Sequence, residues 1–121
     1  MKKKPTFKIF NCGVYPYDIL FTVGSSKEEI VSYLKRKVKY VLDEEEQKSL
    51  EIENQSGRTV RLKNNAMIVW VKTPYLPVIV HELFHVVEMT MLKIHLPLND
   101  DTSEPFAYLM EYLTRQIWTK K

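Results

Sequence analysis

The sequence predicts an α+β domain: a small, mostly antiparallel sheet with one N-terminal helix, one long apolar helix and a C-terminal helix. Two observations predict this class. Short runs of β-forming residues alternate irregularly with longer segments of helical periodicity, and 45% of the residues are apolar. A chain of 121 residues has the usual length of one domain. We therefore expect residues 1–121 to form a single domain.

Two strands are expected first along the chain. Thr6–Cys12 and Ile19–Val23 are short β-rich runs, and Gly13 and Pro16 punctuate the stretch between them. Cys12 is the sole cysteine, so no internal disulfide can form, and a lone thiol suits a reducing compartment. We therefore expect a cytoplasmic protein.

A helix is expected next. Ser26 and Glu29 have the spacing of a capping box at its start. Its apolar residues recur at helical spacing and are expected to face the core: Ile30, Leu34, Val38 and Val41. Four cations lie within residues 35–39, and the acidic run Asp43–Glu46 follows and balances them, so we expect a solvated face and no phosphate-binding one. The net charge of +3 also predicts no nucleic-acid partner.

The second half predicts a hairpin and two helices. Arg58–Leu62 and Ala66–Val71 flank a turn signal, and the second run is almost wholly apolar, so we expect it to be buried on both faces. Leu76–Ile94 has the pattern of a helix that is apolar nearly all round, which predicts a buried helix. It carries too many ionisable side chains to span a membrane, and no membrane partner is expected. A last helix is expected over Pro105–Trp118.

The long helix contains the motif His81-Glu82-Leu83-Phe84-His85. Two imidazoles one helical turn apart can both reach a single Zn²⁺ at about 2.1 Å. Glu82 is placed to act on a metal-bound water without being a ligand. If the helix is buried, the stripe formed by His81, His85 and Glu88 is costly unless a metal satisfies it. The pattern therefore predicts one Zn²⁺ per chain. The competing interpretation is two core histidines bonded to backbone and a salt bridge at Glu82.

A catalytic zinc needs a third protein ligand and one open position. His95 would lie about 15 Å beyond His85 along a continuous helix, which is too far to share the ion. Glu88, three residues after His85, is better placed to orient an imidazole. Glu104 is the better candidate, because the chain can turn and place it at the positive N-terminus of the next helix.

A peptidase also needs a hydrogen-bond donor for the oxyanion of its transition state. Tyr108, Tyr112 and Arg115 on the last helix are candidates, and ordinary packing or surface exposure is the alternative for each. Glu111 lies seven residues after Glu104 and is a candidate to support that ligand, or else a surface residue.

The motif, together with Asp101-Thr102-Ser103-Glu104 and Ala107-Tyr108-Leu109, resembles the gluzincin clan of zinc peptidases. It resembles more closely the minimal metallopeptidases of phages and prophages, and it is distantly similar to the regulatory peptidases that cleave bacteriophage repressors. The resemblance covers about Ala66 to Leu113.

What the resemblance implies is a zincin-like fold in which His81, His85 and Glu104 bind zinc and Glu82 is the general base. It also implies that the strand before the motif helix, Ala66–Val71, presents its backbone edge to an extended peptide.

The sequence supports two functions. The first is a zinc-dependent peptidase acting on a protein or peptide substrate, and the alternative is a non-catalytic zinc module that docks a protein partner. Glu82 favours the peptidase, because a structural zinc site has no use for a carboxylate there. A metal-free helical interaction domain is a third possibility, and the sequence leaves the oligomeric state open.

Overall fold

The computed structural model describes residues 5–12, 15–96 and 98–118, so the expected turn at Gly13 lies outside the described residues. In chain order the elements are β1 (Thr6–Cys12), β2 (Tyr15–Val23), α1 (Lys27–Tyr33), the π-helix η1 (Leu34–Val38), α2 (Glu44–Ser49), β3 (Gly57–Arg61), β4 (Met67–Val71), α3 (Leu76–Lys93) and α4 (Ser103–Trp118).

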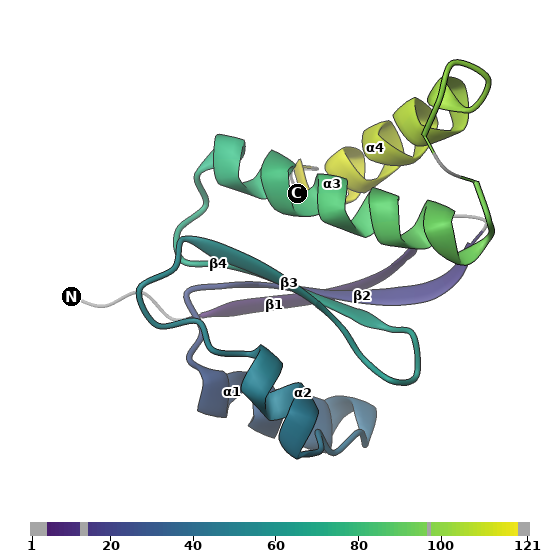
Figure 1. Cartoon of the computed structure of the whole chain (residues 1–121). Helices are drawn as coiled ribbons and strands as arrows, with labels where there is room; N and C mark the ends of the chain where they lie inside the picture. Colours follow the sequence, from purple (N-terminus) through teal and green to yellow (C-terminus); the bar gives the residue numbers. More distant parts are fainter. Residues whose placement is uncertain (1–4, 13–14, 97, 119–121) are drawn as a thin grey trace.

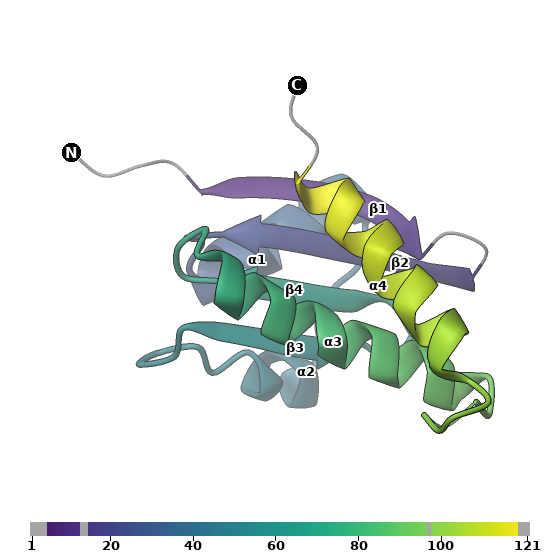
Figure 2. The same ribbon diagram turned by 90° about the horizontal axis from the view of Figure 1, so that it is seen from above.

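One four-stranded sheet lies between two layers of helices (Figure 1). The strand order is β1-β2-β4-β3, with β2 and β4 parallel and the other two pairs antiparallel. Helices α3 and α4 cover one face, and α1 and α2 lie against the other. Seen from above, α4 starts near the C-terminal end of α3 and crosses towards β1 (Figure 2). The α+β class and the mostly antiparallel pairing are confirmed.

The sheet separates two hydrophobic clusters, and β4 contributes to both. Met67, Val69 and Val71 point into the cluster under α3 and α4, whereas Ile68 and Trp70 point into the cluster with α1 and α2. All five residues of β4 are buried, as the apolar run predicted. Alternation along a strand sends successive side chains to opposite faces, so a strand between two layers must be apolar at every position.

The two edge strands are β1 and β3, and β4 lies in the interior of the sheet. The expectation that Ala66–Val71 presents its backbone edge is therefore wrong, because β2 pairs with its second side. Lys72 N–H donates to Ser56 O (2.8 Å), and bonded positions alternate along an antiparallel ladder. The backbone groups that point outward from β3 are therefore those of Gly57, Thr59 and Arg61.

The N-terminal helix changes from α to π geometry at Leu34 and ends at Lys39, which has a left-handed backbone (φ 61°). The wider turn and the reversal shift the helical register. Val38 and Val41 are therefore 43% and 67% exposed, so their expected place in the core is wrong. Leu42, beyond the turn, is buried instead.

Capping boxes start both short helices of this layer. The expected box of Ser26 and Glu29 is present at α1, with Glu29 N–H donating to Ser26 Oγ (3.1 Å). A second box, Asp43 with Glu46, starts α2. The sequence interpretation treated Asp43–Glu46 only as a charge run and missed this helix, although the spacing of Asp43 and Glu46 carried the signal.

The helix α3 is buried on one side only. Val80, Phe84 and Leu92 are 39%, 40% and 55% exposed, so the expectation that it is buried all round is wrong. The physical reason is that the outer side of α3 has no further layer against it among the described residues. Within the described part of the chain, no helix is long and apolar enough to cross a membrane.

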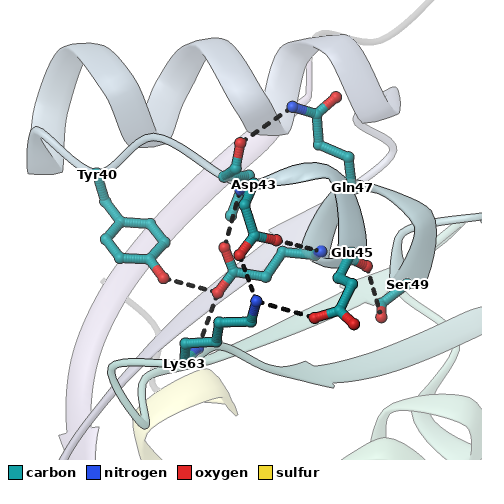
Figure 3. Close-up of polar contacts among 8 residues, drawn as sticks. Tyr40, Asp43, Glu45, Gln47, Ser49 and Lys63 are labelled. Carbon is teal, nitrogen blue, oxygen red and sulfur yellow. Dashed lines mark hydrogen bonds and ion pairs between the residues drawn. The ribbon is translucent and has the colours of Figure 1, made fainter.

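A polar cluster joins α2 to the turn between β3 and β4 (Figure 3). The buried Glu46 carboxylate accepts hydrogen bonds from Tyr40 Oη (2.6 Å), Lys63 N–H (2.8 Å) and Asp43 N–H (3.0 Å). Lys63 Nζ also pairs with Asp43 (2.5 Å) and Glu45 (2.9 Å). Burial alone would raise the pKa of Glu46, but the hydrogen bonds it accepts outweigh burial and hold that pKa below 4.5. The hydrogen bond to Glu46 raises the pKa of Tyr40 above 10.0.

We expect Glu46→Ala to lower the free energy of unfolding by about 2–3 kcal/mol at neutral pH, because three donors lose a buried acceptor. Urea unfolding measures this change. The matched control is Glu44→Ala, an exposed carboxylate in the same turn of α2, which we expect to cost about 0.5 kcal/mol or less. Equal effects of the two substitutions would contradict a stabilising role for the cluster.

The same cluster predicts how stability depends on pH. Folding lowers the pKa of Glu46, so its contribution is present above pH 4.5 and is lost as the pH falls through the lower folded pKa. Folding raises the pKa of Tyr40, so its contribution is present below pH 10.0 and is lost as the pH rises. Urea unfolding at a series of pH values measures this dependence. The difference in free energy of unfolding between wild type and Glu46→Ala should become smaller as the pH falls below 4.5. The difference in free energy of unfolding between wild type and Tyr40→Phe should become smaller as the pH rises above 10.0. Differences that stay constant with pH would contradict both pKa shifts.

Candidate functional site

The centre of the candidate site is the histidine pair on α3. The helix starts after Tyr75, with Pro77 in its first turn, where a missing N–H costs nothing. His81 and His85 follow one turn apart, and their Nε2 atoms approach to 3.3 Å. The two rings are nearly perpendicular, with an interplanar angle of 79°.

This separation fits a shared metal ion. Two nitrogens bound at about 2.0–2.1 Å to one tetrahedral Zn²⁺ lie about 3.3–3.4 Å apart. The same separation also suits a hydrogen bond between one protonated and one unprotonated Nε2. The separation is therefore compatible with a shared metal ion, and a hydrogen bond between the two rings accounts for it equally well.

The stripe formed by His81, His85 and Glu88 faces solvent. His81 is exposed, and the side chains of His85 and Glu88 are 45% and 49% exposed. The expectation that their burial demands a metal is wrong, because the outer side of α3 is uncovered. Desolvation of these side chains therefore does not require a metal ion, and only the geometry of the histidine pair favours one. Glu88 Oε1 lies 3.7 Å from His85 Nδ1, near the ring nitrogen that does not face His81.

Glu82, in contrast, is the buried member of the motif, with 6% of its surface exposed. Its side chain points towards β3, where Thr59 Oγ1 donates to Glu82 Oε1 (2.6 Å) and also lies 3.1 Å from the Glu82 carbonyl oxygen. A hydroxyl bonded to a buried carboxylate holds that carboxylate in one rotamer. The edge strand therefore determines where this carboxylate lies.

Gly57 permits this close approach of β3 to α3. A Cβ atom at this position would lie 2.8 Å from Val78 Cγ1 and 3.0 Å from both Cγ and Oε2 of Glu82. The glycine thus leaves the space that the Glu82 side chain fills. Gly57 and Thr59 are two residues apart and share the face of β3 that meets α3. Sequence reasoning missed both roles, since the only available signal was this i, i+2 spacing.

A hollow of ≈ 390 Å³ lies between β3 and α3. Its lining residues are Gln55, Gly57, Arg58, Thr59, His81, Glu82, His85 and Met89. A second hollow continues it towards the start of α3, past Pro77 and Val78. The histidine pair and Glu82 therefore lie along one groove beside the edge strand.

The structure does not assemble the expected third ligand with the histidines. Glu104 is exposed in the first turn of α4. Among the residues the structure describes, no group of three or more histidine, cysteine, aspartate or glutamate side chains could hold a metal ion. The local motif thus brings together only two of the three candidate ligands, and Glu104 lies apart from them on α4.

The remaining candidates on α4 have other contacts. Tyr112 Oη lies 3.1 Å from Asn11 Oδ1 on β1, and Arg115 pairs with Glu111 (2.5 Å) one turn away. Tyr108 is 67% exposed. None of these residues lines the described part of the groove beside His81.

Comparisons with known proteins add no relative. No protein-family model matches the chain, and neither a curated protein nor a solved structure matches it.

We expect Thr59→Val to lower the free energy of unfolding by about 1–3 kcal/mol, because the buried Glu82 carboxylate loses its side-chain donor. Thr59→Ser keeps the hydroxyl and is the matched control, with a smaller loss. Chemical denaturation of the three proteins tests this. If valine costs no more than serine, the hydrogen bond from Thr59 to Glu82 makes no specific contribution to stability.

Proposed function

We propose that this protein is a zinc-dependent peptidase with a zincin-like fold, which hydrolyses a peptide bond of a protein substrate. The observation that carries the proposal is the approach of the two Nε2 atoms to 3.3 Å, in a groove that also contains Glu82. Two convergent imidazoles and one adjacent carboxylate are the components that metal-assisted hydrolysis requires.

His81 and His85 would hold the ion, and Glu104 is the proposed third ligand. Support for Glu104 comes from the resemblance and from its place in the first turn of α4, where a carboxylate is favoured. When bound, zinc lowers the pKa of a coordinated water and polarises the carbonyl of the bond to be cleaved. In this proposal, α4 shifts relative to α3 to bring Glu104 to the histidine pair.

Glu82 is the proposed general base. Thr59 holds Oε1, which leaves Oε2 to accept a proton from the attacking water and to deliver it to the leaving amine. The groove around Glu82 restricts the solvent that reaches it, and a restricted environment strengthens electrostatic interactions with a reacting group.

The outer edge of β3 is the proposed binding element for the substrate. Its outward backbone groups belong to Gly57, Thr59 and Arg61, two of which line the groove beside His81. An extended peptide that adds to this edge would form main-chain hydrogen bonds along the groove. The resemblance implies that β4 binds the extended peptide, but β4 has no free edge, so β3 takes this role in the proposal.

A specific observation also supports the alternative function, a zinc module that docks a partner without cleaving it. Glu82 is buried and bonded to Thr59, and the described residues hold no complete group of three ligands. A carboxylate held in this way also serves as a structural contact between α3 and β3. Only the peptidase needs this carboxylate for catalysis, so replacing Glu82 distinguishes the two functions.

Metal content per chain is the first test. We expect about one zinc per chain after the purified protein is supplied with zinc, loss of zinc in His81→Ala and in His85→Ala, and weakened binding in Glu104→Ala. Elemental analysis and calorimetric titration measure these outcomes. Glu44→Ala is the control, an exposed carboxylate in the other helical layer that is expected to leave the ion bound. If wild type takes up no zinc, both the peptidase and the zinc module are excluded.

Cleavage of a labelled unfolded protein then separates the two functions. We expect Glu82→Gln to keep zinc and to lose about 10²–10⁴-fold in cleavage rate, because the base is removed and the ligands stay. Glu44→Gln makes the same chemical change at an exposed site in the other helical layer and should retain the rate. A zinc-loaded wild type without cleavage, indistinguishable from Glu82→Gln, would leave the docking module as the function.

A further inference from the structure

A protruding basic turn lies in the other helical layer, on the face of the sheet opposite the histidine pair (Figure 1). All five residues at positions 35–39 are exposed. Five successive helical residues point in all directions around the axis, so this last turn projects from the body of the protein. Its π geometry and the left-handed Lys39 set it off from the rest of the helix.

Four of these five residues are cations that other side chains do not neutralise: Lys35, Arg36, Lys37 and Lys39. Among the described residues, none of the four is in an ion pair. Three of the four acidic residues that follow at positions 43–46 have partners outside this turn. Asp43 and Glu45 pair with Lys63, and Glu46 is buried in its own hydrogen bonds. The acidic run therefore does not pair with the four cations, although the balance of charge along the sequence predicted that it would offset them.

Two exposed aliphatic side chains belong to the same stretch of the chain as the cations. Val38 is 43% exposed and Val41 is 67% exposed, and they come from the turn and from the segment just after it. A nucleic acid would gain little from them. The nearby aromatic ring that could stack on a base is already covered, since Phe7 stacks on Tyr33 at 4.2 Å and Arg36 lies 5.9 Å from the same ring centre.

We propose that the turn 35–41, the basic turn, docks on the surface of an anionic lipid bilayer. Clustered cations are attracted to acidic headgroups, and small aliphatic side chains between them enter the boundary between headgroups and acyl chains. This association is peripheral and reversible, since the turn is short and no lipid anchor is needed. It revises the expectation that the protein has no membrane partner, and it does not depend on the proposed peptidase function.

Co-sedimentation of the full chain with vesicles tests this proposal. The probes are vesicles of phosphatidylcholine alone and of phosphatidylcholine with phosphatidylserine, each at low and high salt. We expect binding only to the acidic vesicles, weakened by salt. Lys35→Gln combined with Lys37→Gln should lower the partition coefficient roughly 30-fold, and Val41→Ser roughly tenfold.

The matched control is Lys72→Gln combined with Lys93→Gln, which lowers the net charge equally at exposed sites outside the basic turn. It should bind nearly as wild type does, and circular dichroism checks that every variant is folded. Three outcomes overturn the proposal: no binding to acidic vesicles, equal losses in both double variants, or no effect of Val41→Ser together with displacement by a single-stranded oligonucleotide. The last outcome would identify a nucleic-acid surface.

Discussion

The interior strand β4 is the constraint on which the rest of the structure depends. Its five side chains alternate into two hydrophobic clusters, so helices must cover both faces of the sheet. The chain leaves β4 at Lys72 and starts α3 only four residues later. Because that link is short, α3 lies back across the strands it has just left. The motif therefore comes to rest beside β3, and the Glu82 carboxylate reaches Thr59.

What could be predicted from the sequence was local. The strand β4, the limits of α3 and the Ser26 capping box each depend on a few neighbouring residues, and each was predicted correctly. The positions of Val38 and Val41 were predicted wrongly, because apolar spacing cannot reveal that a helix widens to π geometry and then reverses at Lys39. The apolar residues on the outer side of α3 gave a similar error, since hydrophobicity does not report whether a second layer exists.

The candidate site also combines local features, which could be predicted from the sequence, with features that depend on distant segments. The approach of His81 and His85 follows from one helical turn and could be predicted from their spacing alone. The roles of Thr59 and Gly57 required knowledge of which strand forms the edge, and that depends on pairing between distant segments. Glu104 also belongs to a separate helix, so its relation to the histidines depends on how α4 packs and not on its own neighbours.

The parallel pairing of β2 with β4 has a consequence for the order of folding. It joins Ile19 to Met67, so the sheet can close only after most of the chain has been made. The histidine pair needs only a formed helix, whereas the contact between Glu82 and Thr59 needs the closed sheet. All four strands precede His81 in the chain, so during synthesis the sheet that carries Thr59 can close before the histidine pair is made, and α3 then brings Glu82 to a strand that is already in place.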